Sequence, residues 1–304
     1  MRRSIFVGTA VLFVAAPACA QQDFSKVEIK VEQLAPGVAV LFGAGGNIGL
    51  SYGEDGNVLI DDQFAPLTPK ILAAVKTLDP DPVSFVVNTH WHGDHSGGNE
   101  NLGKAGAVIV AHDNVRRRMS VERLSQRFGK TAASPKAALP VVTFGEGVTL
   151  HLNGDDLRIV HVRNAHTDGD SLVYWRKANV LHMGDTFFHK ISFPFIDLES
   201  GGSIDGMIAA AKAGLVIAGQ GTRIIPGHGP VASHAELEAY HAMLVDVRVK
   251  VAAGIAAGRS LAAIQVGKPA ARYGMLDGFM SPDDFVATVH ESLRRSAPKP
   301  RRRR

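Results

Sequence analysis

Residues 83–95 read VSFVVNTHWHGDH, and this stretch decides the fold of the 304-residue chain. Its apolar first half predicts a buried β-strand, and four side chains that can bind a metal follow within six positions: His90, His92, Asp94 and His95. His90 and His92 lie on the same side of an extended segment, because side chains there alternate with a period of two. Gly93 then allows a turn that brings the last two of these side chains back toward the first two.

Three histidines and one carboxylate in a single turn indicate a metal site rather than a solvated polar loop. Protonated imidazoles so close together would repel one another and resist burial unless a cation neutralised the group. Imidazole nitrogens with a carboxylate oxygen form a ligand set that zinc accepts without thiolate. The arrangement suits two cations better than one.

The pattern His90-x-His92-x-Asp94-His95 after a strand that ends in Asn88-Thr89 resembles the signature of the metallo-β-lactamase superfamily. Three further pieces that the resemblance requires follow in order: Ala165-His166-Thr167, Met183-Gly184-Asp185 and Pro226-Gly227-His228-Gly229. The resemblance covers roughly residues 27–243. It implies an αβ/βα sandwich, a four-layer α/β (α+β) fold in which helices flank two mixed β-sheets. Periodicity alone indicates only a layered α/β or α+β class.

The resemblance also implies two Zn²⁺ ions as cofactors. Seven side chains would hold them: His90, His92 and His166 on the first ion, Asp94, His95 and His228 on the second, and Asp185 between the two. Zinc lowers the pKa of bound water from 15.7 to about 7, and two ions roughly 3.5–4 Å apart can share a hydroxide and stabilise the oxyanion formed at a carbonyl. Asp94 is also the catalytic candidate, because a carboxylate there could orient the nucleophile or carry a proton to the leaving group.

Three more residues are expected close to the metals. Asp61 matches an aspartate that the family places beneath the site, where it would accept a histidine N–H and fix the orientation of that ligand. His189 and Lys190 follow Asp185 closely enough to reach the cleft, where Lys190 could bind a substrate carboxylate. An exposed loop is the alternative for this pair.

Two further stretches border the predicted cleft. The glycine-rich residues 43–49 could form a short flap over it, since glycine permits close approach and movement. Four phenylalanines follow Asp185 and either line a substrate wall or belong to the core, and we expect at least two of them in the core: Phe187, Phe188, Phe193 and Phe195.

Hydrophobic patterning predicts the remaining elements. Strands are expected at residues 27–31, 38–42, 48–52, 58–61, 83–87, 107–110, 141–144, 148–152, 157–162, 171–175 and 179–182, and helices at 69–78, 114–128, 204–217, 236–257 and 262–295. A serine cap, a proline and two acidic residues at 281–284 mark a helix start within the last segment.

Residues 1–20 have the form of a signal peptide, with two arginines, an apolar run at 5–16 and a cleavage site after Ala20. A run of about 12 apolar residues is too short for a membrane anchor, which needs around 20. We therefore expect an exported, periplasmic protein whose mature chain has no membrane span. Arg2-Arg3 leaves both the Sec and the twin-arginine export routes open.

The mature chain is expected to form one domain. Residues 21–258 would be the catalytic domain, 259–296 a C-terminal helical extension of that domain, and 297–304 a disordered basic tail. The oligomeric state is not predicted.

Net charge argues against a nucleic-acid substrate. The whole chain carries +4, but seven cationic residues lie in the leader and the tail, which leaves −3 for residues 21–298. The only cysteine, Cys19, lies in the leader, so no disulfide is expected in the mature protein. The same fact excludes the β-lactamase subclass that uses a cysteine ligand on its second zinc.

Together these features predict a zinc-dependent hydrolase of small molecules, which attacks an acyl carbon of a cyclic amide or ester and whose class includes β-lactamases. A glyoxalase-II-like thioester hydrolase is the alternative within the same class, since fold and metal centre do not choose the substrate. An iron-dependent oxidoreductase on this fold is less favoured, because the diiron variants carry glutamate where this chain has His92. A non-catalytic zinc-binding protein would be expected to have an incomplete ligand set.

Overall fold

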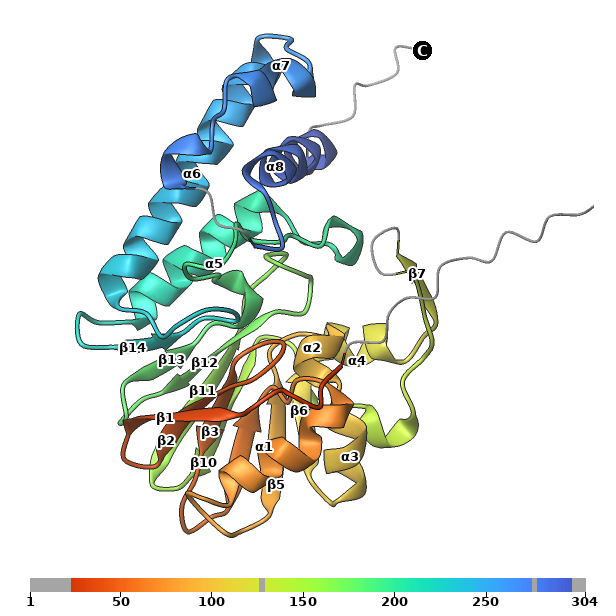
Figure 1. Ribbon diagram of the computed structural model, residues 1–304, viewed down its shortest axis with the longest axis vertical. Helices are drawn as coiled ribbons and strands as arrows, with labels where there is room; N and C mark the ends of the chain where they lie inside the picture. Colours follow the sequence, from red (N-terminus) through yellow and green to blue (C-terminus); the bar gives the residue numbers. More distant parts are fainter. Residues whose placement is uncertain (1–22, 126–128, 275–277, 297–304) are drawn as a thin grey trace, which may run out of the picture.

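The N-terminal strands carry apolar side chains on both faces, so each face needs its own covering layer. In β2 (Val38–Phe42), Ala39 and Leu41 belong to one buried cluster, and Val38 and Val40 belong to another. The computed structural model describes residues 23–125, 129–274 and 278–296. It has four layers in the order helices, sheet, sheet, helices, so both faces of the sheets are covered (Figure 1). The predicted αβ/βα sandwich is confirmed.

The first sheet has the strand order β1-β2-β3-β4-β5-β6-β9. Strands β1 to β4 pair antiparallel, whereas β4, β5, β6 and β9 run parallel. Besides β2, its strands are β1 (Lys30–Ala35), β3 (Ile48–Ser51), β4 (Asn57–Ile60), β5 (Val83–Asn88), β6 (Val108–His112) and β9 (Val142–Phe144). Helices α1 (Thr68–Val75) and α3 (Asn99–Lys104) cover its outer face, where Ile71 and Leu102 share a core cluster with Leu41.

The second sheet has the order β10-β11-β12-β13-β14 and is antiparallel except for its last pair. Its strands are β10 (Gly147–Leu152), β11 (Asp155–His161), β12 (Ser171–Trp175), β13 (Val180–His182) and β14 (Arg223–Ile225). Trp175, fully buried, lies in the cluster between the two sheets together with Val40 and Ile60. Helices α5 (Ile204–Ile217), α6 (His234–Ala256) and α8 (Pro282–Ser296) form the outer layer beyond this sheet (Figure 1).

The C-terminal helices pack on that outer layer. Phe285 and Val289 of α8 are fully buried in the same cluster as Met207 of α5 and Leu244 of α6. The helix start predicted at Ser281 is present, where the Ser281 hydroxyl accepts a hydrogen bond from the Asp284 amide at 3.1 Å. The burial of Phe285 and Val289 joins α8 to the core. The predicted domain boundaries stay a prediction.

Several elements differ from the expectations. The strand expected at 27–31 runs from Lys30 to Ala35, and helix α3 was not predicted. The helix predicted at 114–128 ends early, as α4 (Asp113–Met119), and the chain continues into the hairpin of β7 (Arg123–Ser125) and β8 (Gly129–Thr131). The Arg123 guanidinium lies 3.7 Å from the centroid of the Trp91 ring, a tertiary contact that overrides helix propensity. The segment 262–295 holds two helices, α7 (Leu261–Val266) and α8, rather than one. The short strand β14 was not predicted, because three residues carry too little periodic signal.

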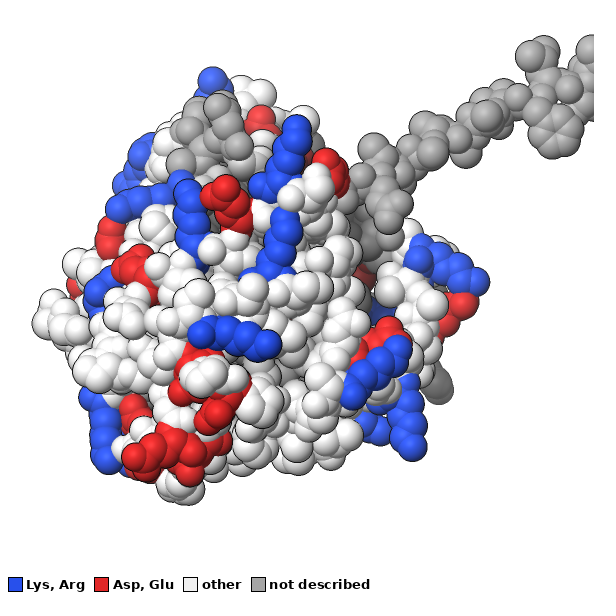
Figure 2. Space-filling view, turned by 60° about the horizontal axis from the view of Figure 1, so that its bottom comes forward, with Lys and Arg blue, Asp and Glu red and all other residues white. Residues whose placement is uncertain are grey.

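The predicted leader and the basic tail lie outside the described residues. Within residues 23–125, 129–274 and 278–296, no helix has the length and hydrophobicity that a membrane span requires. Basic and acidic side chains are interspersed on the face drawn in Figure 2.

Candidate metal centre

Both sheets contribute to one site, at the ends where their strands stop. His90 and His92 follow β5, and the short helix α2 (Gly93–Ser96) carries Asp94 and His95. The second sheet supplies the other three residues from loops after β11, β13 and β14: His166, Asp185 and His228. The seven predicted ligands form two groups, and within each group the ligand atoms lie within 4.8 Å of one another.

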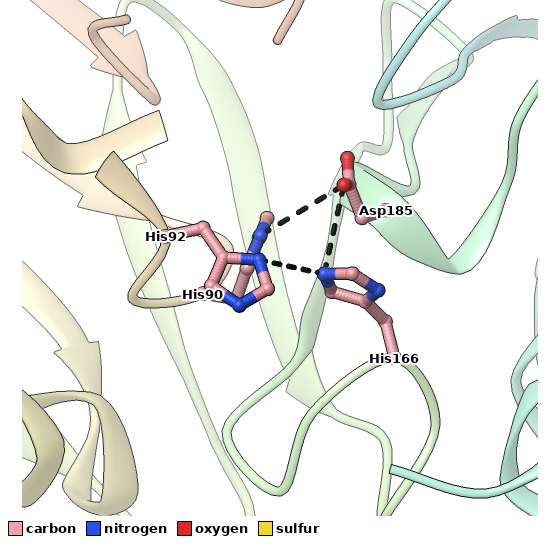
Figure 3. A group of neighbouring side chains, drawn as sticks. All are labelled: His90, His92, His166 and Asp185. Atoms are coloured by element: carbon pink, nitrogen blue, oxygen red, sulfur yellow. Dashed lines mark hydrogen bonds and ion pairs between the residues drawn. The ribbon is translucent and has the colours of Figure 1, made fainter. Parts of the chain in front are cut away.

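The first group contains His90, His92, His166 and Asp185, all buried (Figure 3). The Nδ1 atom of His92 lies 2.9 Å from Nε2 of His166. Asp185 Oδ2 faces this group, at 3.6 Å from Nε2 of His166 and 4.0 Å from Nε2 of His90. Figure 3 shows the four side chains converging on one point, with His90 and His92 on one loop and His166 and Asp185 on two others.

The second group contains Asp94, His95 and His228. The other oxygen of Asp185, Oδ1, lies 3.0 Å from Nε2 of His95 and 3.3 Å from Nε2 of His228. Asp94 Oδ2 lies 3.3 Å from the same nitrogen of His228. Asp185 therefore presents one carboxylate oxygen to each group, which is the geometry of a bridging ligand.

Hydrogen bonds hold the far sides of the rings. The Asp61 carboxylate accepts from His95 Nδ1 at 2.8 Å and from the Thr89 hydroxyl at 2.7 Å. That hydroxyl lies 3.1 Å from His90 Nδ1, and since its proton is given to Asp61, it accepts from the ring. Each ring is thereby left with its other nitrogen, Nε2, facing the centre, as expected for a metal-binding histidine.

Asp197 completes this support and was not predicted from the sequence. Its Oδ2 accepts from His92 Nε2 at 3.0 Å, which leaves Nδ1 of His92 as the ligand atom. The other oxygen of Asp197 accepts from the backbone amides of Glu199 and Ser200. In the sequence this residue has only the signature of a turn, because the contact with His92 spans 105 positions. His166 Nδ1 is held similarly, by the carbonyl of Phe195 at 2.8 Å.

The donor set fits metal ions. Nε2 of His90 is a buried polar atom without a hydrogen-bond partner, and it points into the first group. Such an orphaned nitrogen costs free energy unless a ligand satisfies it. Five imidazoles and two carboxylates, with no thiolate, match the nitrogen and oxygen ligands that zinc accepts.

Histidines of the two groups have pKa values shifted in opposite directions. Burial lowers the pKa of His90 well below its usual value and that of His166 to about 4, so both rings are neutral. Burial also opposes protonation of His228, but the Asp185 carboxylate overcomes it and raises the pKa to about 9. The pKa of His95 is raised well above its usual value, again against burial and chiefly by Asp185. Metal binding in the second group therefore displaces protons.

The glycine-rich stretch before β3 is tied down rather than a free flap. The Gly46 amide donates to the Asp94 carbonyl at 3.0 Å, and the Asn47 amide donates to the Gly227 carbonyl at 2.7 Å. A Cβ atom on Gly46 would lie 2.1 Å from Cε1 of His95. Glycine is required here because the His95 ring packs directly on the backbone.

The predicted substrate contacts of His189 and Lys190 are not seen. The Lys190 ammonium lies 2.5 Å from Glu236 at the start of α6, and neither residue lines the pocket beside the metal ligands. His189 is buried, and its Nδ1 donates to the Pro230 carbonyl at 2.8 Å. The role of this pair in substrate binding stays a prediction, and the ion pair with Glu236 favours the alternative of an exposed loop for Lys190.

Fold and site together define a metal-binding cluster of histidines and aspartates at the edge of an αβ/βα sandwich. A sequence profile of the metallo-beta-lactamase superfamily matches residues 42–228, more than half of the chain, and the chain belongs to this superfamily. Its members are mostly hydrolases.

A curated relative gives a weaker match. It is a hydroxyacylglutathione hydrolase from Erythrobacter litoralis (strain HTCC2594), 25% identical over 107 residues, which are 35% of this chain and 35% of that protein. The chain thus aligns with about a third of the length of this relative.

Solved structures share the fold. A metallo-beta-lactamase from Pontibacter korlensis has a TM-score of 0.60 at 19% identity, over 72% of this chain and 100% of that one. A stereoselective inverting sec-alkylsulfatase from a Pseudomonas species has a TM-score of 0.65 at 16% identity, over 90% of this chain and 52% of that one. At these identities the likeness concerns the fold alone.

Replacing Gly46 by alanine is expected to displace the His95 ring and to weaken the second metal position selectively. The variant should bind one zinc tightly where the parent binds two, as measured by metal titration against a chromogenic chelator. Gly93→Ala is the matched control, because a Cβ there meets nothing within 4 Å. Equal stoichiometry in the two variants would contradict the packing argument.

Asp197→Asn is expected to lower zinc affinity at the first position by about 10–100-fold, because the amides of Glu199 and Ser200 hold the one remaining oxygen and an NH2 group then faces His92. Competition with a chelator of known affinity measures the change. Asp205→Asn serves as the control, since Asp205 pairs only with Arg248 on the surface among the described contacts. Unchanged affinity in Asp197→Asn would show that His92 is held by packing alone.

Proposed function

We propose that this protein is a zinc-dependent hydrolase that binds two Zn²⁺ ions and cleaves an acyl bond of a cyclic amide or ester. The bridging geometry of Asp185 between two histidine groups is the observation that carries the proposal. A pocket of about 690 Å³ opens directly over the ligands, with Asp94, Asp185 and His228 in its wall. A small molecule could therefore place a reacting bond against the centre.

When bound, two zinc ions would supply a water of lowered pKa and a Lewis acid for the carbonyl oxygen. The protein's own residues set the geometry around them. Asp94 is the carboxylate in the pocket wall with the larger exposure, 29% of its side chain against 6% for Asp185. Its carboxylate can therefore reach both a water and a substrate, orient the attacking water and pass the proton to the leaving group.

A thioester hydrolase is the second candidate within the same chemistry. The partial match to a hydroxyacylglutathione hydrolase supports it, because the name of that relative describes cleavage of an acyl glutathione. The metal centre alone does not choose between the two candidates, since the same attack at an acyl carbon would release an amine, an alcohol or a thiol.

Metal analysis with hydrolysis assays tests this proposal. Mass spectrometry of the purified protein is expected to find two zincs per chain, and chelation should abolish turnover that added zinc restores. A chromogenic cephalosporin and a simple thioester are the two assay substrates, and their rates decide between the candidates. Iron in place of zinc would favour the oxidoreductase, and zinc without turnover of any cyclic amide, ester or thioester would refute the hydrolase.

Asp94→Asn is expected to lower kcat by about 10²–10⁴-fold, the usual contribution of a positioned acid or base. The rate is measured per loaded site, with zinc content determined on the same sample, because Asp94 is also a proposed ligand. Asp205→Asn, far from the pocket, should keep the parental kcat. A fully loaded Asp94→Asn variant with unchanged kcat would remove Asp94 from the proton transfer.

A further inference from the structure

Most of the surface that lines the pocket over the metal centre is apolar, and the polar side chains in its lining other than the metal-site residues are Thr131 and Ser192. Six large side chains line it: Phe64, Trp91, Phe188, Ile191, Phe195 and Phe279. Phe188 stacks on the ligand His228, with centroids 5.3 Å apart and planes 16° from parallel, and Phe195 stacks on His92 at 6.1 Å. The apolar wall therefore begins at the metal ligands themselves.

The apolar lining continues outward to exposed side chains. Phe279, 59% exposed, meets Phe195 edge to face with centroids 5.7 Å apart, and Ile191 is 39% exposed. Phe187 and Phe193, by contrast, lie in the core, as expected for at least two of the four phenylalanines after Asp185. Exposed aromatic and aliphatic groups at a pocket typically bind an apolar ligand.

The cations near the pocket are held elsewhere. Lys190 pairs with Glu236, and Arg118 makes two bonds to the Asp168 carboxylate. Arg123 lies over the Trp91 ring and donates to Ser200 at 2.8 Å, whereas its Nη1 is buried without a hydrogen-bond partner. It lines a smaller hollow of about 180 Å³ that adjoins the main pocket, because Trp91 and Thr131 line both. No lysine or arginine stands among the described residues that line the main pocket.

From this lining we propose that the acyl group of the substrate, whether an amide, an ester or a thioester, is an uncharged hydrocarbon chain or ring. The inference rests on the proposed hydrolase function and names its substrate class. An anionic group on the distal part of a substrate would lose its hydration among the phenylalanines without gaining a partner, which is costly.

Matched esters test the proposal on the zinc-loaded protein. The 4-nitrophenyl esters of hexanoate and adipate have acyl chains of equal length that end in a methyl group or a carboxylate. Water adds its hydroxyl to the acyl carbon, the C–O bond breaks, and 4-nitrophenolate leaves with the bonding pair. We expect kcat/KM to favour hexanoate by at least about tenfold, because the carboxylate is desolvated without a partner.

A positive charge placed in the pocket wall should remove the preference for hexanoate over adipate. Ile191→Lys adds a cation inside the pocket, and the ratio of hexanoate to adipate is expected to fall about tenfold or more. Val216→Lys is the matched control, since Val216 of α5 is 80% exposed and outside the pocket. A ratio that falls equally in both variants would contradict a role for the wall.

A binding assay on the chelated, metal-free protein is independent of turnover. The neutral fluorophore N-phenyl-1-naphthylamine is the probe, and three competitors of similar length are hexanamide, the adipate monoamide and 6-aminohexanamide. Hexanamide alone should displace the probe at low concentration. Displacement by the cation as well would indicate that Asp94 and Asp185, rather than the apolar wall, select the ligand.

The outcomes separate the two proposals. If the adipate ester is hydrolysed as fast as the hexanoate ester, the proposal of an apolar acyl group is overturned and the proposed hydrolase function is not. If Arg123→Gln then abolishes hydrolysis of the adipate ester, Arg123 is the site that binds the carboxylate. No ester turnover with selective hexanamide binding refutes the hydrolase but supports the apolar pocket. Neither turnover nor selective binding refutes both.

Discussion

The two oxygens of the Asp185 carboxylate face two different groups of histidines, and the rest of the site is arranged around this contact. Oδ1 lies 3.0 Å from His95 and Oδ2 lies 3.6 Å from His166. Without cations, the raised pKa values of His95 and His228 favour protonated rings beside the buried carboxylates. The rings of His90 and His166 stay neutral, and Nε2 of His90 has no hydrogen-bond partner. Such an arrangement is costly to bury unless metal ions replace the protons.

The sandwich makes that contact possible by bringing two sheets together at one edge. Loops from both sheets have to approach Asp185 closely, and backbone without side chains makes room for it. A Cβ on Gly227 would lie 2.1 Å from Oδ1 of Asp185, and a Cβ on Gly46 would meet His95. The loop before β3 and the loop after β14 are further tied by Asn47, whose side-chain amide donates to the carbonyls of Pro226 and Gly229. Close backbone contacts thus help to position Asp185 and His95.

Much of this was predictable because it is local. The motif from His90 to His95 and the alternation in β2 are encoded within a few residues of sequence, and the ligand set came from such motifs. Asp197 and the stacking of Arg123 on Trp91 were missed, since they join segments far apart and have only turn or helix character locally. The ion pair of Lys190 with Glu236 was missed for the same reason, because Glu236 lies 46 positions away.

Zinc-edge anomalous diffraction from crystals of the purified protein is the most direct test of the bridging role of Asp185. Two anomalous peaks are expected roughly 3.5–4 Å apart, as in two-metal hydrolytic sites, with one oxygen of Asp185 on each. A single peak within the histidine group of His90, or two peaks with Asp185 turned away from one of them, would contradict the bridging role on which the proposed chemistry depends.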